Sequence, residues 1–192
     1  QEGARAMIVC EWMNQAAGVS GRFLQQQDSY SVNALTFDIQ FSETYSAGGL
    51  GSLRDVQASA EEAGDEVYLG KAQVLEALLI GTAADIWGNI PYSEALTDPT
   101  PVFDGQMQIY ADLQALLTEA IANIGGAGPG PEGTGVDLFY ADGDRDAWIE
   151  TANTLKARYH LHTAEVLGAP AYAAALAAAQ QGISSAANDF RS

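Results

Sequence analysis

Cysteine, basic residues and long apolar runs are all scarce in this sequence. The 192 residues include a single cysteine, Cys10, so the chain can form neither an internal disulfide nor a cluster of thiolate metal ligands. Lysine and arginine number 8 against 25 aspartates and glutamates, which gives a net charge of −17. A field of that sign repels nucleic acid and anionic lipid headgroups, so we exclude nucleic acid as a partner.

The apolar runs are too short for a membrane-spanning helix or a signal peptide. A bilayer span needs about 20 apolar residues, whereas the longest run, residues 74–87, contains Glu76 and Asp85. The short run that ends at Cys10 lacks a signal-peptide apolar core and the small residue that precedes a lipidated cysteine. We therefore expect Cys10 to be a buried residue of a helix.

Patterns typical of catalytic sites are also missing. The sequence has no G-x-S-x-G, P-loop, G-x-G-x-x-G or H-E-x-x-H motif. His160 and His162 would lie about 200° apart around a helix, too far to share a metal ion. His162 continues an apolar stripe and is expected to be a core histidine. A protein that is not an enzyme and holds no cofactor is favoured, with a glycoside hydrolase as the alternative that abundant carboxylates leave open.

Residues 142–146 alternate aspartate with other residues, a spacing that suggests calcium. An EF-hand loop requires glycine at its sixth position and glutamate at its twelfth, where this sequence has Ala147 and Asn153. We expect instead a polar loop that supplies the N-cap of the following helix, and no metal site.

The sequence does contain strong helical periodicity, in segments separated by glycine and proline. Residues 35–41 alternate as a strand would, but the rest of the chain favours a helix there, with a break near residues 48–51. Helices are expected over residues 2–17, 36–63, 66–87, 105–124, 145–167 and 171–181, and a surface loop over residues 125–135. This pattern predicts an all-α fold of antiparallel helical hairpins, a tetratricopeptide-like array in a single domain over residues 1–192.

The segment 66–87 is apolar on almost every side, which predicts a central helix covered by its neighbours. Asp65 is expected to cap its start, as Asp104 is expected to cap the helix after it. Gly88 is expected to supply a left-handed C-cap, and Pro91 to push the residue before it into an extended conformation.

Aromatic residues are the remaining candidates for ligand contact. Trp12, Trp87 and Trp148 follow helical apolar patterns and are expected in the core. Tyr30 and Tyr45 lie near polar and glycine-rich stretches, so we take them as candidate ligand-binding residues, because sugar rings stack on exposed aromatic faces.

Several motifs, in the same order, resemble those of one family. Residues 87–95, WGNIPYSEA, resemble a WGD-[IV]-P-[YF]-x-EA signature, and residues 101–110, PVFDGQMQIY, resemble P-x-[YF]-D-x-Q-x-x-I-Y. Residues 137–144 resemble a D-x-[IVF]-Y-x-G-D loop, and the segment from Trp148 to Arg158 resembles a W-x-x-[FA]-[AT]-N-[ST]-L-K-x-R helix. The chain is thereby similar to the SusD/RagB family, although Asn89 replaces the usual aspartate and Ala141 the usual glycine.

The resemblance implies a role and a location. Members of this family are nutrient-binding lipoproteins on the cell-surface side of the bacterial outer membrane. They bind oligosaccharides, in some cases peptides, and deliver them to a TonB-dependent transporter of the SusC type. We expect this chain to be the N-terminal helical part of such a protein, so the membrane would be reached only through a lipid anchor outside this chain.

The motif residues themselves are expected to be structural rather than ligand contacts. They are Trp87, Gly88, Pro91, Tyr92, Asp104, Trp148, Asn153, Lys156 and Arg158. Asn153, Lys156 and Arg158 are expected to tie their helix to a loop. The alternative function is a helical protein–protein interaction scaffold that has no ligand site of its own.

Overall fold

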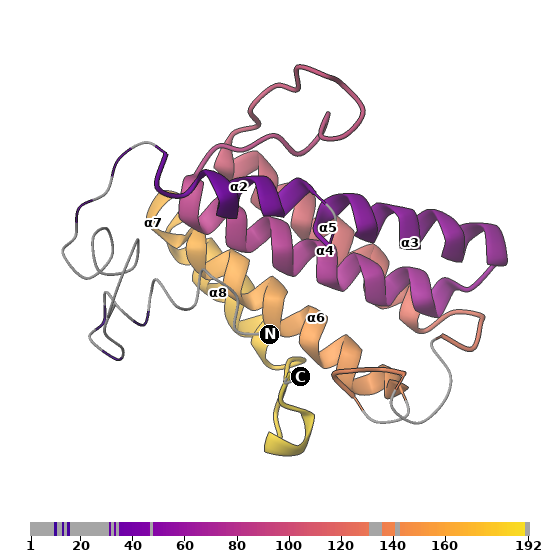
Figure 1. Cartoon of the computed structure of the whole chain (residues 1–192). Helices are drawn as coiled ribbons and strands as arrows, with labels where there is room; N and C mark the ends of the chain where they lie inside the picture. The colour runs from indigo at the N-terminus through magenta and orange to yellow at the C-terminus, as the bar shows by residue number, and fades with distance from the viewer. Residues whose placement is uncertain are drawn as a thin grey trace. The chain divides into compact units, whose positions relative to one another are not determined.

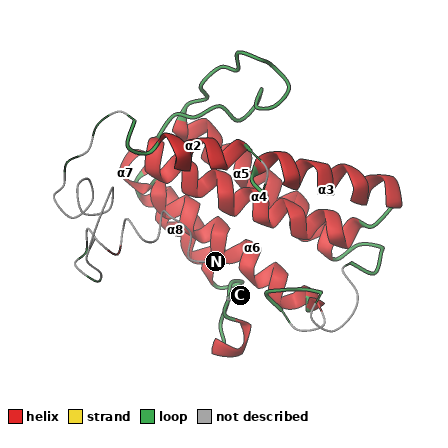
Figure 2. Cartoon of the chain, viewed as in Figure 1, coloured by secondary structure: helices red, strands yellow, loops and turns green. Residues whose placement is uncertain are grey.

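A computed structural model of the chain describes residues 10, 13, 15, 31, 33, 35–46, 48–130, 136–140 and 143–190. The chain divides into two compact units, residues 1–44 and residues 45–192. Within the described ranges every regular element is a helix, and the extended pairing is limited to one antiparallel bridge between Ile90 and Asp104 (Figure 2). The all-α prediction is confirmed, while a single domain over residues 1–192 stays a prediction.

The first unit is described mainly from residue 35 onward. Helix α2 (Asp38–Tyr45) begins at Asp38, and all of it except Tyr45 belongs to this unit. It buries Gln40 and Thr44, whereas the larger Ile39 is 53% exposed. The helical alternative for residues 35–41 is therefore correct. Most of the predicted helix over residues 2–17, with Trp12, lies outside the described residues, as does Tyr30.

The prediction that Cys10 is buried is wrong. Its thiol is free and exposed, and the neighbouring described residues Met13 and Gln15 are exposed too. The apolar pattern suggested a buried helix face, but the described positions of this segment all face solvent.

The second unit is a helical array. It contains α3 (Leu50–Ala63), α4 (Glu66–Trp87), α5 (Gln106–Ile124), α6 (Arg145–His162), α7 (Ala164–Leu167), α8 (Ala169–Ala179) and the 3₁₀ helix η3 (Ala186–Asn188) (Figure 1). Helix α4 packs on α3, α5 and α6, and α8 packs on α6. Because α4 packs on three other helices, it is the central helix, as predicted.

Local chemistry explains where α4 begins and ends. The Asp65 carboxylate accepts a hydrogen bond from the Tyr68 N–H, which caps the start. At the end Gly88 has φ 75° and ψ −113°, so the positive φ is as predicted but the conformation is not the left-handed helical one. By length and composition α4 could cross a membrane, yet 72% of its apolar window is buried, which is typical of a core helix.

Helices α4 and α6 approach each other closely at Gly81. Gly81 lies against the ring of Tyr159, and a Cβ atom at residue 81 would overlap that ring. The Tyr159 hydroxyl donates a hydrogen bond of 2.8 Å to the Ala77 carbonyl, so this buried ring is held on both its apolar and its polar side. The glycine is therefore needed for the close approach of the two helices.

The helix predicted over residues 145–167 is divided in two. Asp144 caps α6 through the Ala147 N–H, as the interpretation of residues 142–146 as a capping loop predicts. Thr163 then ends α6, because its hydroxyl and N–H both bond the His160 carbonyl.

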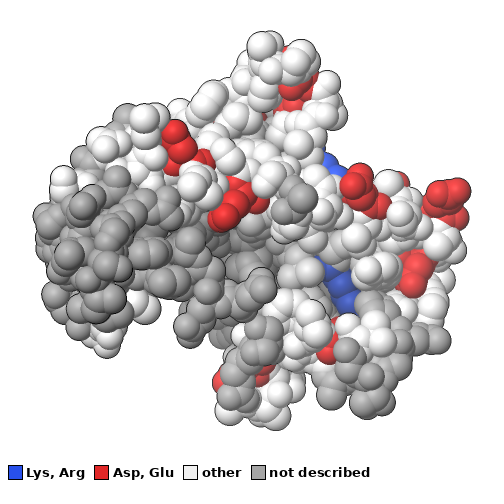
Figure 3. Space-filling model, viewed as in Figure 1, with Lys and Arg blue, Asp and Glu red and all other residues white. Residues whose placement is uncertain are grey.

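On the face shown in Figure 3, acidic side chains are spread widely and basic ones are confined to small areas.

Candidate functional site

An apolar pocket of about 260 Å³ lies between α3, α4 and the loop that precedes α6. Its walls are mostly apolar and aromatic side chains: Leu53, Val56, Tyr68, Ala72, Leu75, Val136, Leu138, Phe139 and Trp148. Tyr68 at its edge is 38% exposed, while Trp148 at its base is 2% exposed. The pocket therefore offers an accessible aromatic edge above a fixed base.

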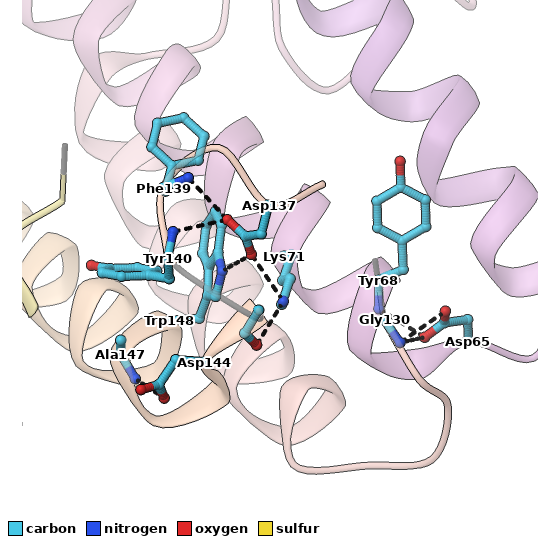
Figure 4. Close-up of polar contacts among 11 residues, drawn as sticks. Asp65, Tyr68, Lys71, Gly130, Asp137, Phe139, Tyr140, Asp144, Ala147 and Trp148 are labelled. Atoms are coloured by element: carbon cyan, nitrogen blue, oxygen red, sulfur yellow. Dashed lines mark hydrogen bonds and ion pairs between the residues drawn. The ribbon is translucent and has the colours of Figure 1, made fainter. Parts of the chain in front are cut away.

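A buried ion pair forms the base of this pocket (Figure 4). Lys71 Nζ lies 3.1 Å from Asp137 Oδ2, and each side chain is less than 5% exposed. The same carboxylate oxygen accepts a 2.7 Å hydrogen bond from the Trp148 indole N–H. Lys71 also donates to the Gly143 carbonyl at 2.9 Å. The pair thus joins α4, the loop and α6 at one point.

Asp137 is held in its ionised form. Its other oxygen accepts the N–H groups of Phe139 and Tyr140, both at 3.0 Å. Burial opposes ionisation, but the hydrogen bonds from Tyr140 and Trp148 outweigh it, so the pKa of the Asp137 carboxyl lies below its ordinary value. Every polar atom that this pair presents is already bonded, so the pocket can accept an apolar group or one face of a ring.

A second pocket, of about 360 Å³, differs in chemistry. We call it the polar groove, and it lies where α6 passes the residues after α8. It is lined by Asp146, Ile149, Glu150, Asn153, Gln180, Gln181, Gly182 and Ser184. Carboxylate, carboxamide and hydroxyl groups can bond paired hydroxyls, so this groove suits a polar, hydroxyl-rich ligand.

The candidate ligand residue Tyr45 lies away from both pockets. It is half-buried, and its hydroxyl donates a 2.9 Å hydrogen bond to the Pro91 carbonyl. Burial, and then the Asp104 carboxylate, raises the pKa of Tyr45 to about 12. The structure thus links Tyr45 to the turn that follows α4, and a ligand contact by Tyr45 or Tyr30 stays a prediction.

The turn after Trp87 is held by polar contacts from α3 and α4. Glu76, which is 4% exposed, accepts a 2.6 Å hydrogen bond from Gln57 and one of 3.1 Å from the Tyr92 hydroxyl. Arg54 lies 3.5 Å from Glu76 and donates to the Ala95 carbonyl at 2.7 Å. These contacts hold Tyr92 within the array, and a purely structural role for Tyr92 stays a prediction.

Asp104 was predicted to cap α5, but its side chain does not cap that helix. Its carboxylate accepts hydrogen bonds from the N–H groups of Tyr92 and Ser93, each at 2.8 Å, and from the Ser93 hydroxyl. These bonds keep the pKa of Asp104 below its ordinary value despite its burial. The Asn89 side chain takes the capping role instead, because its Oδ1 accepts the Gln106 N–H at 3.0 Å.

Trp87 is also placed differently from the prediction, because it is half-buried rather than in the core. It is the last residue of α4, where the chain turns away from the neighbouring helices. Pro91 is buried and follows the extended residue Ile90, as predicted.

His162 is not a core histidine. It is exposed, and its Nδ1 lies 2.7 Å from Asp85 Oδ1, while Arg158 lies 2.9 Å from Asp85 Oδ2. Tyr110 also donates to Asp85 at 2.7 Å. His162 is the last residue of α6, so its ring meets the Asp85 carboxylate and solvent.

Two other motif residues of α6 also bond within the helical array. Lys156 donates to the Thr118 hydroxyl of α5, and burial lowers its pKa. Asn153 donates to the Ile149 carbonyl of its own helix at 3.0 Å. The expectation that Asn153, Lys156 and Arg158 tie a helix to a loop is wrong, because Lys156 and Arg158 tie α6 to other helices and Asn153 bonds within α6.

Sequence reasoning did not single out the Lys71–Asp137 pair. A lone lysine in a helix that is otherwise almost wholly apolar is a signal that could have found it, because a buried charge needs a partner. Among the described residues, no group of three or more His, Cys, Asp or Glu side chains could hold a metal ion.

Comparison with known proteins places this architecture in a family. Residues 3–190 match the SusD-like family described as starch-binding and associating with the outer membrane. A SusD/RagB family protein from Bacteroides thetaiotaomicron has a TM-score of 0.82 and 25% identity, covering 96% of this chain and 39% of that chain. That likeness confirms the predicted SusD-like array of helical hairpins.

Two further solved structures are similar. A chitin-binding protein has a TM-score of 0.70 and 26% identity, covering 85% of this chain and 35% of that one. A SusD homologue from Bacteroides uniformis has a TM-score of 0.63 and 26% identity, covering 73% of this chain and 30% of that one. The chain thus spans 39% or less of each of these structures, and no curated protein matches it. The match over residues 3–190 shows that the chain belongs to the SusD-like family of SusD/RagB proteins.

Proposed function

We propose that this protein binds oligosaccharides on the outer face of the bacterial outer membrane and passes them to a TonB-dependent transporter of the SusC type. The observation that carries the proposal is the family match over residues 3–190. The similarity to a chitin-binding protein supports a carbohydrate over a peptide as the ligand. The protein acts as a lipid-anchored binding protein and not as an enzyme.

The polar groove is our candidate for the saccharide contact within this chain. Gln180 and Gln181 are exposed at its edge, next to Ser184. Carboxamides offer a donor and an acceptor side by side, which matches a pair of neighbouring sugar hydroxyls. In the apolar pocket the polar atoms of Lys71 and Asp137 are already bonded, so this pocket suits the less polar face of a ring.

Calorimetric titration with chito- and malto-oligosaccharides tests this function. We expect saturable heat with one of the two series, and at least about a fivefold weaker affinity in a Gln180→Ala, Gln181→Ala variant. Gln108→Ala is the matched control, because Gln108 is an exposed amide on α5 away from the groove. Absence of binding to any oligosaccharide would overturn the proposal, and release of reducing ends from a bound one would overturn the non-enzymatic role.

A second candidate function is a helical interaction scaffold without its own ligand site. It is favoured by the exposure of large apolar side chains such as Phe103, which is 64% exposed. Binding to the transporter without binding to any saccharide would select this function over the first.

A further inference from the structure

The lining of the polar groove comes from two segments that differ in charge. Asp146, Glu150 and Asn153 belong to α6 and follow one another at spacings of four and three residues. Residues at these spacings lie on the same face of a helix, one turn after another. Most of the remaining lining comes from residues of the segment 180–184. The α6 side of the groove is therefore acidic, while the other side carries neutral amides and a hydroxyl.

Hydrogen bonds hold the two sides of the groove together. The Thr154 hydroxyl accepts the Ile183 N–H at 2.9 Å, and Glu150 Oε2 accepts the side-chain N–H of Asn188 at 2.9 Å. Gly182 is buried against Thr154, where a Cβ atom would lie 2.6 Å from the hydroxyl oxygen. The groove is thus formed before a ligand arrives, which lowers the entropy cost of binding.

Several oxygen atoms on the α6 side are available to a ligand. Among the described residues, none donates a hydrogen bond to the Asp146 carboxylate, and Glu150 receives its side-chain bond at Oε2 alone. The Asn153 nitrogen donates to the Ile149 carbonyl, so its amide oxygen faces no described donor. Carboxylate and amide oxygens accept hydrogen bonds and cannot donate them. A ligand on this side has to supply the donors.

No positive charge balances the carboxylates within the groove. None of the eight described residues that line it is lysine, arginine or histidine, and the segment 163–190 contains none of these either. Arg145 donates to two carbonyls of the loop after α5, while Lys156 and Arg158 bond α5 and α4. The groove therefore attracts a cation and repels an anion.

We propose that the polar groove binds a protonated amino sugar, with its ammonium group against the Asp146 and Glu150 carboxylates and its ring hydroxyls at the amides of residues 180–181. An ammonium brings three donors and a positive charge to two carboxylates one helical turn apart. A hydroxyl in its place brings one donor and no charge, and a sugar carboxylate brings a charge of the wrong sign. This inference rests on the proposed function, because it names the class of saccharide for the same groove.

Calorimetric titration with three β-1,4-linked tetrasaccharides tests the inference. Tetramers of glucosamine, N-acetylglucosamine and glucose share one backbone but carry an ammonium, an acetamide and a hydroxyl at C2. The titration is done at about pH 5.5, well below the ordinary pKa of an amine. We expect the glucosamine tetramer to bind about fivefold more tightly than the glucose tetramer. Added salt should reduce that advantage, because it screens the charges.

Charge-removing variants locate the preference in the groove. Asp146→Asn and Glu150→Gln should each reduce the advantage of the glucosamine tetramer over the glucose tetramer about threefold. Asp146 is exposed, and Glu150→Gln keeps an oxygen for the bond from Asn188, so melting temperatures should not change. Glu62→Gln is the matched control, because Glu62 is exposed on α3 and does not line the groove. It should bind all three tetramers as the unaltered chain does.

The outcomes separate this inference from the proposed function. If the glucose tetramer binds as tightly as the glucosamine tetramer, the groove does not recognise the ammonium, and this inference is overturned while the proposed function stands. If Glu62→Gln reduces the preference as much as Asp146→Asn does, the preference comes from the charge of the whole chain, and the inference is again overturned. If no oligosaccharide of any series binds, the proposed function fails and this inference fails with it.

Discussion

Removal of the Asp137 carboxylate is the perturbation that best tests how this chain is held together. Asp137→Ala leaves the Lys71 ammonium buried with the Gly143 carbonyl, and leaves the Trp148 indole N–H without its acceptor. Loss of one member of a buried ion pair costs about 3–5 kcal/mol of unfolding free energy. We expect that full cost, because side-chain exposure at this pair is only 4% and 3%.

The partner substitution should cost less, which gives the test its direction. In Lys71→Met the carboxylate keeps three N–H donors, from Phe139, Tyr140 and Trp148. Three such hydrogen bonds can stabilise an anion without a cation, so we expect a loss below about 2 kcal/mol. Asp137→Asn retains one acceptor oxygen for the two loop N–H groups. Its loss of unfolding free energy should therefore lie between those of Lys71→Met and Asp137→Ala.

Urea unfolding followed by far-ultraviolet circular dichroism measures these differences. Near-ultraviolet circular dichroism adds a tryptophan signal that includes Trp148. If Lys71→Met proves as costly as Asp137→Ala, then the ammonium and not the N–H donors holds the carboxylate. If Asp137→Ala unfolds at the same urea concentration as the unaltered chain, the pair contributes nothing and the reasoning is refuted.

The pH dependence of stability follows from the same site. The pKa of Asp137 is lowered on folding, so its contribution is present above the unfolded-state pKa, near 3.8. That contribution is lost as the pH falls through the lower folded-state pKa. The unaltered chain should therefore lose more stability than Asp137→Asn below about pH 4, as urea titrations at a series of pH values would measure.

Three further changes test other parts of the second unit. Trp87→Ala should cost about 2 kcal/mol in urea unfolding, because a half-buried ring loses about half of the 3–5 kcal/mol of a buried one; a loss above that full range would mean that the ring is wholly buried. Asn89→Ala should cost about 1 kcal/mol by removing the cap from the Gln106 N–H, and Asn89→Asp should restore it; equal melting temperatures of the two would contradict this. Gly81→Ala should lower stability by about 3 kcal/mol through overlap with Tyr159, although alanine favours helices; a higher melting temperature would refute the close contact.

The helices were predictable because their signals are local. Asp65 and the glycine after residue 87 limit α4, and an apolar sequence between them requires cover on all sides. The break near residues 48–51 likewise separates α2 from α3. At His162 the local pattern failed, because a helical stripe continues past the point where a neighbouring helix still covers it.

Side-chain partners were less predictable, because most of them are distant in sequence. Asp104 has the residue type and position of a helix cap, yet its carboxylate bonds N–H groups 11 and 12 residues earlier. Asn89 caps α5 from 17 residues away, and Lys71 meets Asp137 across 66 residues. Sequence alone identifies a polar side chain that needs a partner, but the fold decides which partner lies within reach.

The motif residues that identify the family are therefore poor guides to the ligand. Tyr92, Asp104, Trp148 and Arg158 direct their polar atoms to other residues of the array. Such residues are constrained by the fold whatever the protein binds. We expect any ligand recognition by this chain to come from groups that the array leaves free, such as the exposed amides at 180–181. Substitutions at those positions should change binding while leaving the melting temperature unchanged, whereas substitutions at the motif should do the reverse.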